Sequence, residues 1–88
     1  STQLKVSGIE LFSGGDFEGR HGGEPIVLRD GCRGVYRKLV LCNGRLVGAL
    51  LYGDAADAAW YARLIRSGAD VAAQRTGLIF GSRYAEAA

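Results

Sequence analysis

One histidine and a few acidic residues near it are the first candidates for acid–base or metal chemistry. His21 lies in a glycine-rich segment, and three carboxylates stand close to it in the sequence: Asp16, Glu18 and Glu24. A protein metal site normally needs three or four placed ligands, and a general base needs a pocket. We therefore expect His21 to be a solvated loop residue, with a role as base or metal ligand as the alternative.

Two cysteines are the other candidates for metal or redox chemistry. Cys32 and Cys42 are separated by nine residues, which does not match the C-x-x-C spacing of zinc and redox motifs. Two cysteines also cannot hold an iron–sulfur cluster, which takes four ligands. We expect two reduced thiols; a single disulfide and a small metal-binding domain formed with His21 are the alternatives.

The segment 13–23 contains five glycines and invites comparison with phosphate-binding loops. A Walker loop ends in Gly-Lys-Ser/Thr, and a dinucleotide fingerprint runs from a strand into a helix. Here the segment is acidic and no helix pattern follows it. We therefore expect this segment to be a flexible connection. The sequence also lacks the G-x-S-x-G motif of serine hydrolases. The sequence thus predicts no catalytic, cofactor-binding or metal-binding residue in this chain.

Exposed cations and one tryptophan are candidates for contact with a partner. Trp60 falls at the edge of the apolar arc of a predicted helix, where an aromatic side chain can anchor an interface. Arg63 and Arg66 fall on the opposite side of that helix. We take these three residues as interface candidates. Further basic residues near a predicted hairpin are expected to form a solvated face, with docking of an acidic partner as the alternative: Arg37, Lys38 and Arg45.

These residues must be positioned by a small set of strands. Runs rich in β-branched and aromatic residues predict one bent strand over 4–12 and straight strands over 26–30, 34–42 and 45–52. The Asn43-Gly44 pair between the last two predicts a type I′ hairpin. Because residues 34–42 become apolar on both faces, this strand is expected in the interior of the sheet.

A helix is predicted after the strands. Asp54 is expected to be its N-cap, the helix to span 55–67, and Gly68 to end it. The remaining residues are expected to be irregular, with a short apolar segment at 78–80 and a frayed tail at 82–88. Strands followed by a helix indicate an α+β domain: a mostly antiparallel sheet of about four strands with one main helix on one face.

Length and charge limit the possible classes of function. Eighty-eight residues, of which 48% are hydrophobic, suffice for one packed domain. Eleven basic and nine acidic residues are interleaved along the chain, so the basic cluster of a nucleic-acid-binding protein is missing. The sequence shows neither a membrane-spanning run nor the pattern of a signal peptide. We expect a soluble, cytoplasmic domain. Since methionine is absent, the chain is expected to be either a product whose initiator was removed ahead of Ser1 or a piece excised from a longer polypeptide, and the second option is the one followed below.

Several segments resemble a known family. They are LKVSGIELFSGGDF at 4–17, YRKLVL at 36–41, GRLVGA at 44–49, and the stretch from 53 to 68. Their order and spacing resemble the C-terminal domain of FAD-dependent NAD(P)H oxidoreductases of the nitrite reductase large subunit and rubredoxin reductase type. The resemblance covers most of residues 4–81 and departs from the family pattern at 18–24.

The resemblance implies a non-catalytic domain within a larger flavoprotein, with an assimilatory nitrite reductase (nitrate assimilation) as the expected parent. Such a domain follows FAD-binding and NAD(P)H-binding domains of the same chain, and FAD and NAD(P)H belong to those domains. It would supply interdomain packing, an acceptor-facing surface or a homodimer contact. The alternative is a stand-alone protein-interaction module without a redox role.

Overall fold

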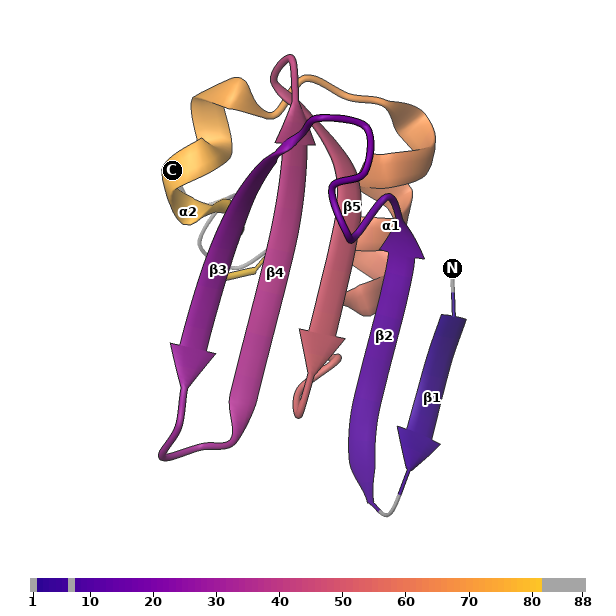
Figure 1. Ribbon diagram of the computed structural model, residues 1–88, viewed down its shortest axis with the longest axis vertical. Coiled ribbons are helices and arrows are strands. Elements are labelled where there is room, and N and C mark those ends of the chain that lie inside the picture. Colours follow the sequence, from indigo (N-terminus) through magenta and orange to yellow (C-terminus); the bar gives the residue numbers. More distant parts are fainter. Residues whose placement is uncertain (1, 7, 82–88) are drawn as a thin grey trace.

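A computed structural model describes residues 2–6 and 8–81; the tail predicted at 82–88 lies outside them. Five strands form one antiparallel sheet in the order β1-β2-β5-β4-β3 (Figure 1). They are β1 (Thr2–Val6), β2 (Ile9–Gly15), β3 (Glu24–Asp30), β4 (Val35–Cys42) and β5 (Arg45–Tyr52).

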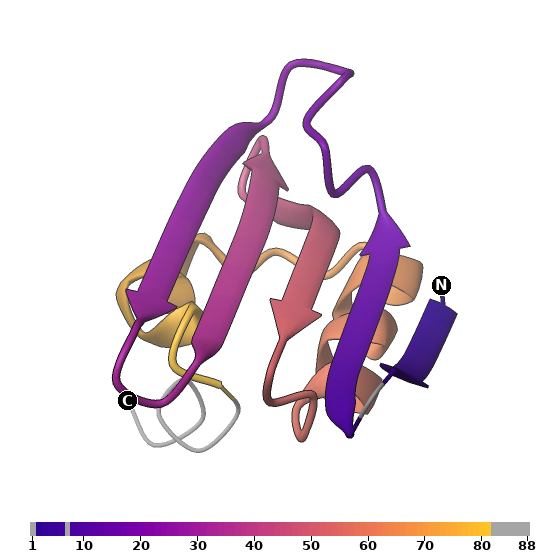
Figure 2. The ribbon, with the colours of Figure 1, turned by 60° about the horizontal axis from the view of Figure 1, so that its bottom comes forward.

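Three helical segments follow the strands: α1 (Ala58–Ser67), the 3₁₀ helix η1 (Ala72–Gln74) and the single turn α2 (Arg75–Leu78). They lie on one face of the sheet, which Figure 2 shows from a second direction. The predicted α+β class is confirmed. Among the described residues, no helix has the length and apolar character needed to cross a bilayer.

The first strand differs from its prediction. Residues 4–12, expected as one bent strand, form two strands in which Val6 pairs with Ile9 and Leu4 with Leu11. Gly8 lies between them with φ of 82°, a conformation that side chains rarely adopt but glycine adopts freely. The chain therefore reverses at Gly8, and the sheet gains a strand.

The predicted hairpin between β4 and β5 is confirmed. Asn43 and Gly44 have φ of 54° and 77°, as both central residues of a type I′ turn require. β4 lies between β3 and β5, which confirms its predicted position in the interior of the sheet.

The helix ends as predicted but begins later. Gly68 adopts a left-handed conformation with φ of 66°, and its N–H donates to the carbonyl of Leu64 at 3.1 Å. The helix starts at Ala58 rather than at residue 55, so Asp54 is not its N-cap. Asp57 occupies that position, and its carboxylate makes no capping hydrogen bond.

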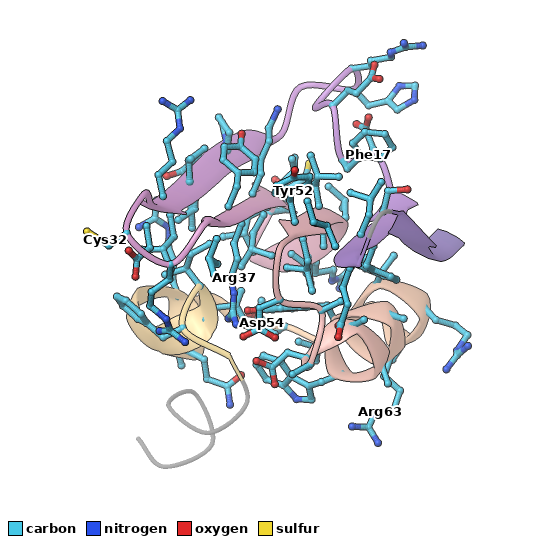
Figure 3. All side chains as sticks on the ribbon, turned by 90° about the horizontal axis from the view of Figure 1, so that it is seen from below. Phe17, Cys32, Arg37, Tyr52, Asp54 and Arg63 are labelled. Atoms are coloured by element: carbon cyan, nitrogen blue, oxygen red, sulfur yellow. The ribbon has the colours of Figure 1, made fainter. Side chains whose placement is uncertain are left out.

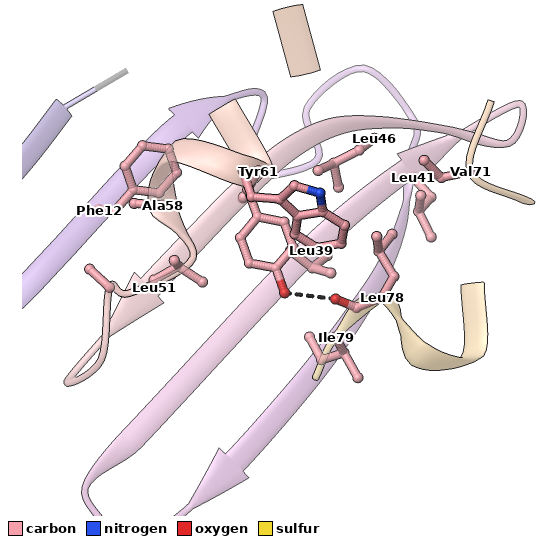
Figure 4. Packing of buried hydrophobic residues seen from close by; sticks show 13 residues of the cluster. Phe12, Leu39, Leu41, Leu46, Leu51, Ala58, Tyr61, Val71, Leu78 and Ile79 are labelled. Atoms are coloured by element: carbon pink, nitrogen blue, oxygen red, sulfur yellow. Dashed lines mark hydrogen bonds between the residues drawn. The ribbon is translucent and has the colours of Figure 1, made fainter. Parts of the chain in front are cut away.

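The core lies between the sheet and the helical layer (Figure 4). Its members include strand residues such as Phe12, Leu39 and Leu51 and the helix residue Tyr61. Trp60, expected at the edge of the helix, belongs to the core: it is 8% exposed, and its ring centroid lies 5.1 Å from that of Tyr61.

The segment after α1, expected to be irregular, completes this core. Val71, Leu78 and Ile79 are buried in it, and only the last residue of the predicted apolar segment, Phe80, is exposed. Short helical turns suffice here, because the residues that reach the core lie at the two ends of this segment. Val71 precedes η1, Leu78 is the last residue of α2, and Ile79 follows it.

Candidate functional site

The face of the sheet opposite the helices is the main candidate for a functional surface. Successive side chains of a strand point to opposite faces, so residues next to the core residues Phe12, Leu39 and Leu51 point away from the helices. Figure 3 shows Tyr52 on this side of the sheet, with Arg37 and Asp54 toward the helices. In the described part of the chain, no helix covers it. We call this surface the open face.

The pairing register arranges the open face in cross-strand rows. The first row runs Arg29, Tyr36, Tyr52 and Leu11 across β3, β4, β5 and β2. The second runs Val27, Lys38, Leu50 and Ser13 across the same strands. The third runs Pro25, Val40, Gly48 and Gly15.

The first two rows leave an apolar surface in contact with solvent. Val27 is 46% exposed and Tyr52 43% exposed, and Ile9, at the end of β2, is 39% exposed. Leu11 and Leu50 are half-buried. Contiguous exposed apolar surface of this kind marks a contact with another protein surface more often than isolated apolar residues do.

Among the described residues of β2 to β5, two cations lie on the open face and no residue there is acidic. The guanidinium carbon of Arg29 stands 5.5 Å from the centroid of the Tyr36 ring, a cation–π arrangement. Lys38 is half-buried in the second row. For neither cation does a described carboxylate lie within ion-pair distance.

The glycine-rich segment covers one end of the open face. β2 extends to Gly15, so the loop begins at Asp16, later than predicted. Its first residue donates its N–H to the carbonyl of Val47 at 2.8 Å, and Val40 beneath the loop is fully buried. A Cβ on Gly48 would overlap the backbone of Asp16, so a side chain at this position would lift the loop away from the sheet.

The loop is held in shape by the carboxylate of Asp16. It accepts the backbone N–H groups of Arg20 and His21, each at 3.0 Å. The bond from His21 is the main cause that lowers the pKa of Asp16 below its usual value. The segment expected to be a flexible connection thus has an internal hydrogen-bonded structure. Figure 3 shows its Phe17 on the same side of the sheet as Tyr52.

Arg37 lies on the other face of β4, under the helices, and not on the solvated face where it was predicted. Its side chain is 9% exposed and lies 3.6 Å from the carboxylates of both Asp54 and Asp57. It also donates to the carbonyl of Ile79 at 3.3 Å. The guanidinium thus lies between the two carboxylates that precede the helix, and Asp54 in addition accepts the N–H of Ala56 at 3.0 Å.

Tyr61 completes this cluster. Its hydroxyl donates to the carbonyl of Leu78 at 2.7 Å (Figure 4), and burial raises its pKa to about 12. With Arg37, it fastens the segment 78–79 to the core. The arrangement is that of a structural anchor, since each polar group has a partner within the fold, apart from the Nε of Arg37.

The interface candidates of the sequence do not share one surface. Arg63 and Arg66 are exposed on the outer side of α1, and Figure 3 shows Arg63 pointing away from the domain. Trp60 is buried. Lys38 lies on the open face, and Arg45 is exposed at the start of β5.

The candidates for metal and redox chemistry are dispersed. His21 is exposed in the loop, Cys32 is exposed in the turn between β3 and β4, and Cys42 is half-buried at the end of β4. In the described part of the chain, no three His, Cys, Asp or Glu side chains are grouped so as to hold a metal ion. The two cysteines are free thiols.

Comparison with known proteins identifies relatives. A family model described as the rubredoxin NAD⁺ reductase C-terminal domain matches residues 1–69. The chain is 42% identical over 71 residues to a nitrite reductase (NAD(P)H) of Bacillus subtilis, and this covers 81% of the chain and 9% of the relative. It is 33% identical over 57 residues to the assimilatory nitrate reductase electron transfer subunit of the same organism, covering 65% of the chain and 7% of the relative. The chain thus spans less than a tenth of these relatives. No solved structure matches it significantly.

Proposed function

The chain belongs to the rubredoxin NAD⁺ reductase C-terminal domain family, and from this premise we propose that it is the non-catalytic C-terminal domain of an FAD-dependent NAD(P)H oxidoreductase, an assimilatory nitrite reductase. Within that enzyme, hydride passes from NAD(P)H to FAD, and electrons continue to an acceptor. The upstream domains of the same cytoplasmic chain bind both cofactors. The similarity to the Bacillus nitrite reductase supports this parent.

The domain supplies packing against the body of the reductase, by which we mean the part of the enzyme outside the matching segment. The observation that carries this role is the open face: apolar residues of four strands reach solvent on the face that no helix of the described residues covers. Burial of such a surface is the main favourable contribution to contacts between domains. Arg63, which points away from the domain on the helix side (Figure 3), and the exposed Arg66 of the same helix remain available for an electron acceptor or a second subunit.

A binding experiment with the Bacillus relative tests this role. We expect the 88-residue chain to bind the Bacillus nitrite reductase from which the matching segment has been deleted, as measured by isothermal titration calorimetry. If the shortened reductase is unfolded alone, its refolding on addition of the chain is the binding signal. The matched controls are Leu50→Ser on the open face, which should weaken binding, and Arg63→Ser on the helix, which should not.

The result also separates this proposal from the alternative. A chain that neither binds nor refolds the shortened reductase would favour a stand-alone interaction module. The reading frame upstream of Ser1 gives a second test, because a flavoprotein frame continues into G-x-G-x-x-G segments. A start codon directly before Ser1 would favour the module.

A flavin titration tests the non-catalytic assignment. We expect the isolated chain to bind FAD no more tightly than millimolar, because its glycine-rich loop lacks the strand–loop–helix arrangement that cradles a dinucleotide phosphate. The measurement is the change in FAD fluorescence on addition of the chain. Micromolar affinity would contradict the assignment.

A further inference from the structure

Lys38 lies near the centre of the open face. It pairs with Val27 of β3 on one side and with Leu50 of β5 on the other. Along its own strand, Tyr36 precedes it and Val40 follows it on the same face. A positive charge thus stands within the apolar part of the surface.

The carboxylates of the glycine-rich loop and of the segment before α1 are engaged elsewhere, and no described carboxylate lies within ion-pair distance of Lys38. In the glycine-rich loop, Asp16 accepts two backbone N–H groups, and Glu18 pairs with Arg20. Asp54 and Asp57 pair with Arg37 on the helix side. The described part of the chain therefore offers Lys38 no partner of its own.

A surface that covers the open face takes the Lys38 ammonium out of water. Burial of a charge without a partner opposes association strongly, whereas a carboxylate placed opposite compensates it. Arg29 differs, because it lies on the edge strand β3 and stacks over Tyr36. At such a rim a cation keeps its contact with water.

We propose that the open face is held on the reductase body by an ion pair between Lys38 and a carboxylate of that body, enclosed by apolar contacts. The inference rests on the proposed function and specifies the chemistry of the partner surface. The occupant is the remainder of the reductase polypeptide, because the matching segment makes up only 9% of the Bacillus relative and the rest supplies the protein surface. A second copy of the chain and an anionic cofactor are the other occupants that the test distinguishes.

The experiment titrates variants of the 88-residue chain into the shortened Bacillus nitrite reductase. Lys38→Gln should weaken binding by about tenfold or more, and Lys38→Glu by about a hundredfold, because a carboxylate then faces a carboxylate. Arg29→Gln is the matched control and should change affinity by less than about threefold. Circular dichroism of each variant confirms that the chain itself is folded.

Salt concentration separates an enclosed ion pair from a rim charge. At about 0.3 M salt, exposed charges are largely screened, so the effect of Arg29→Gln should vanish. The loss of binding affinity caused by Lys38→Gln should persist at this salt concentration. Equal affinities of Lys38→Gln and the unaltered chain would overturn the inference, while the proposed function would stand if Leu50→Ser still weakened binding.

Two further outcomes would also overturn it. Competition of FAD or pyrophosphate with the chain would show that Lys38 faces a cofactor phosphate. A dimer of the chain alone that Lys38→Gln converts to a monomer would show that a second copy is the occupant. Failure of the unaltered chain to bind at all would instead contradict the proposed function.

Discussion

Two neighbouring residues of β4, Arg37 and Lys38, carry the same charge into opposite environments. Arg37 turns toward the helices and meets the carboxylates of Asp54 and Asp57, whereas Lys38 turns toward solvent on the open face. The alternation of side chains along a strand is the cause. The two residues therefore differ in role: one maintains the fold, and the other is available to a partner.

This difference predicts unequal effects on stability. Arg37→Gln removes the guanidinium that lies beside Asp54 and Asp57 and should lower the free energy of unfolding by about 2–3 kcal/mol, below the cost at a fully buried pair because both carboxylates are partly exposed. Lys38→Gln should change it by less than about 0.5 kcal/mol. Urea denaturation of the isolated chain measures both, and equal losses would contradict the assignment of Arg37 to the interior.

The buried hydroxyl of Tyr61 should make the stability of the fold depend on pH in the alkaline range. Tyr61→Phe removes the hydrogen bond to the Leu78 carbonyl and should cost about 0.5–1.5 kcal/mol near neutral pH. The folded pKa is raised to about 12, above the usual value of about 10. The hydroxyl therefore stabilises the fold fully below pH about 10 and loses this contribution as the pH rises to about 12.

The stability difference between the wild-type chain and Tyr61→Phe should accordingly shrink across that pH interval. Denaturation at a series of pH values measures it. Tyr52→Phe is the matched control, because it removes the same hydroxyl group from a tyrosine that is exposed on the open face rather than buried in the core. A difference that stays constant up to pH about 12 would contradict the buried, neutral state of Tyr61.

At the scale of elements, the glycine-rich loop is a cover for one end of the sheet. Gly48 permits the close approach, since its hydrogen lies where any other residue would place a Cβ against the loop backbone. The loop buries Val40, which otherwise would extend the apolar surface of the open face. The loop thus defines where the apolar part of the open face ends.

Gly48→Ala should therefore displace the loop. We expect a loss of about 1–3 kcal/mol in the free energy of unfolding, together with faster hydrogen exchange of the Asp16 amide, which loses its bond to Val47. Gly31→Ala is the control, because a Cβ there meets open space. Slow exchange retained in Gly48→Ala would show that the loop is held independently of the sheet.

On the scale of the whole molecule, the domain extends beyond the segment that defines its family. The family model ends at residue 69, yet Val71, Leu78 and Ile79 belong to the same core as the sheet. Arg37 and Tyr61, both within the matched range, bind the carbonyls of Ile79 and Leu78. Residues 71–79 are therefore an integral part of the fold.

A chain that ends at residue 69 should be largely unfolded. Its three missing core side chains contribute about 4–8 kcal/mol of burial, comparable with the total stability of a domain of this size. Leu78→Ala is the milder variant and should cost about 2–5 kcal/mol. Thermal denaturation followed by circular dichroism measures both, and a cooperative transition at unchanged temperature in the shorter chain would contradict this view.

The sequence by itself determined the local structure and its class. Asn43-Gly44 and Gly68 set their turn and cap because glycine and asparagine are suited to positive φ, and this holds whatever surrounds them. The alternation along 36–42 also assigned Tyr36 and Lys38 to one face and Arg37 and Leu39 to the other. It did not tell which of these faces the helices would cover.

Only the tertiary structure decided that question. Arg37 lies inside, where Asp54 and Asp57, distant in sequence, meet it beneath the helices, and the helix begins only at Ala58. Within the glycine-rich loop, Gly23 is required because a Cβ there would overlap Val40, which the sheet brings beneath the loop, and Gly48 of the sheet leaves room for the backbone of Asp16. Trp60 is buried because the chain after α1 returns to the core. These outcomes depend on contacts between distant segments, which local pattern does not encode, and they are what leave the open face free for a partner.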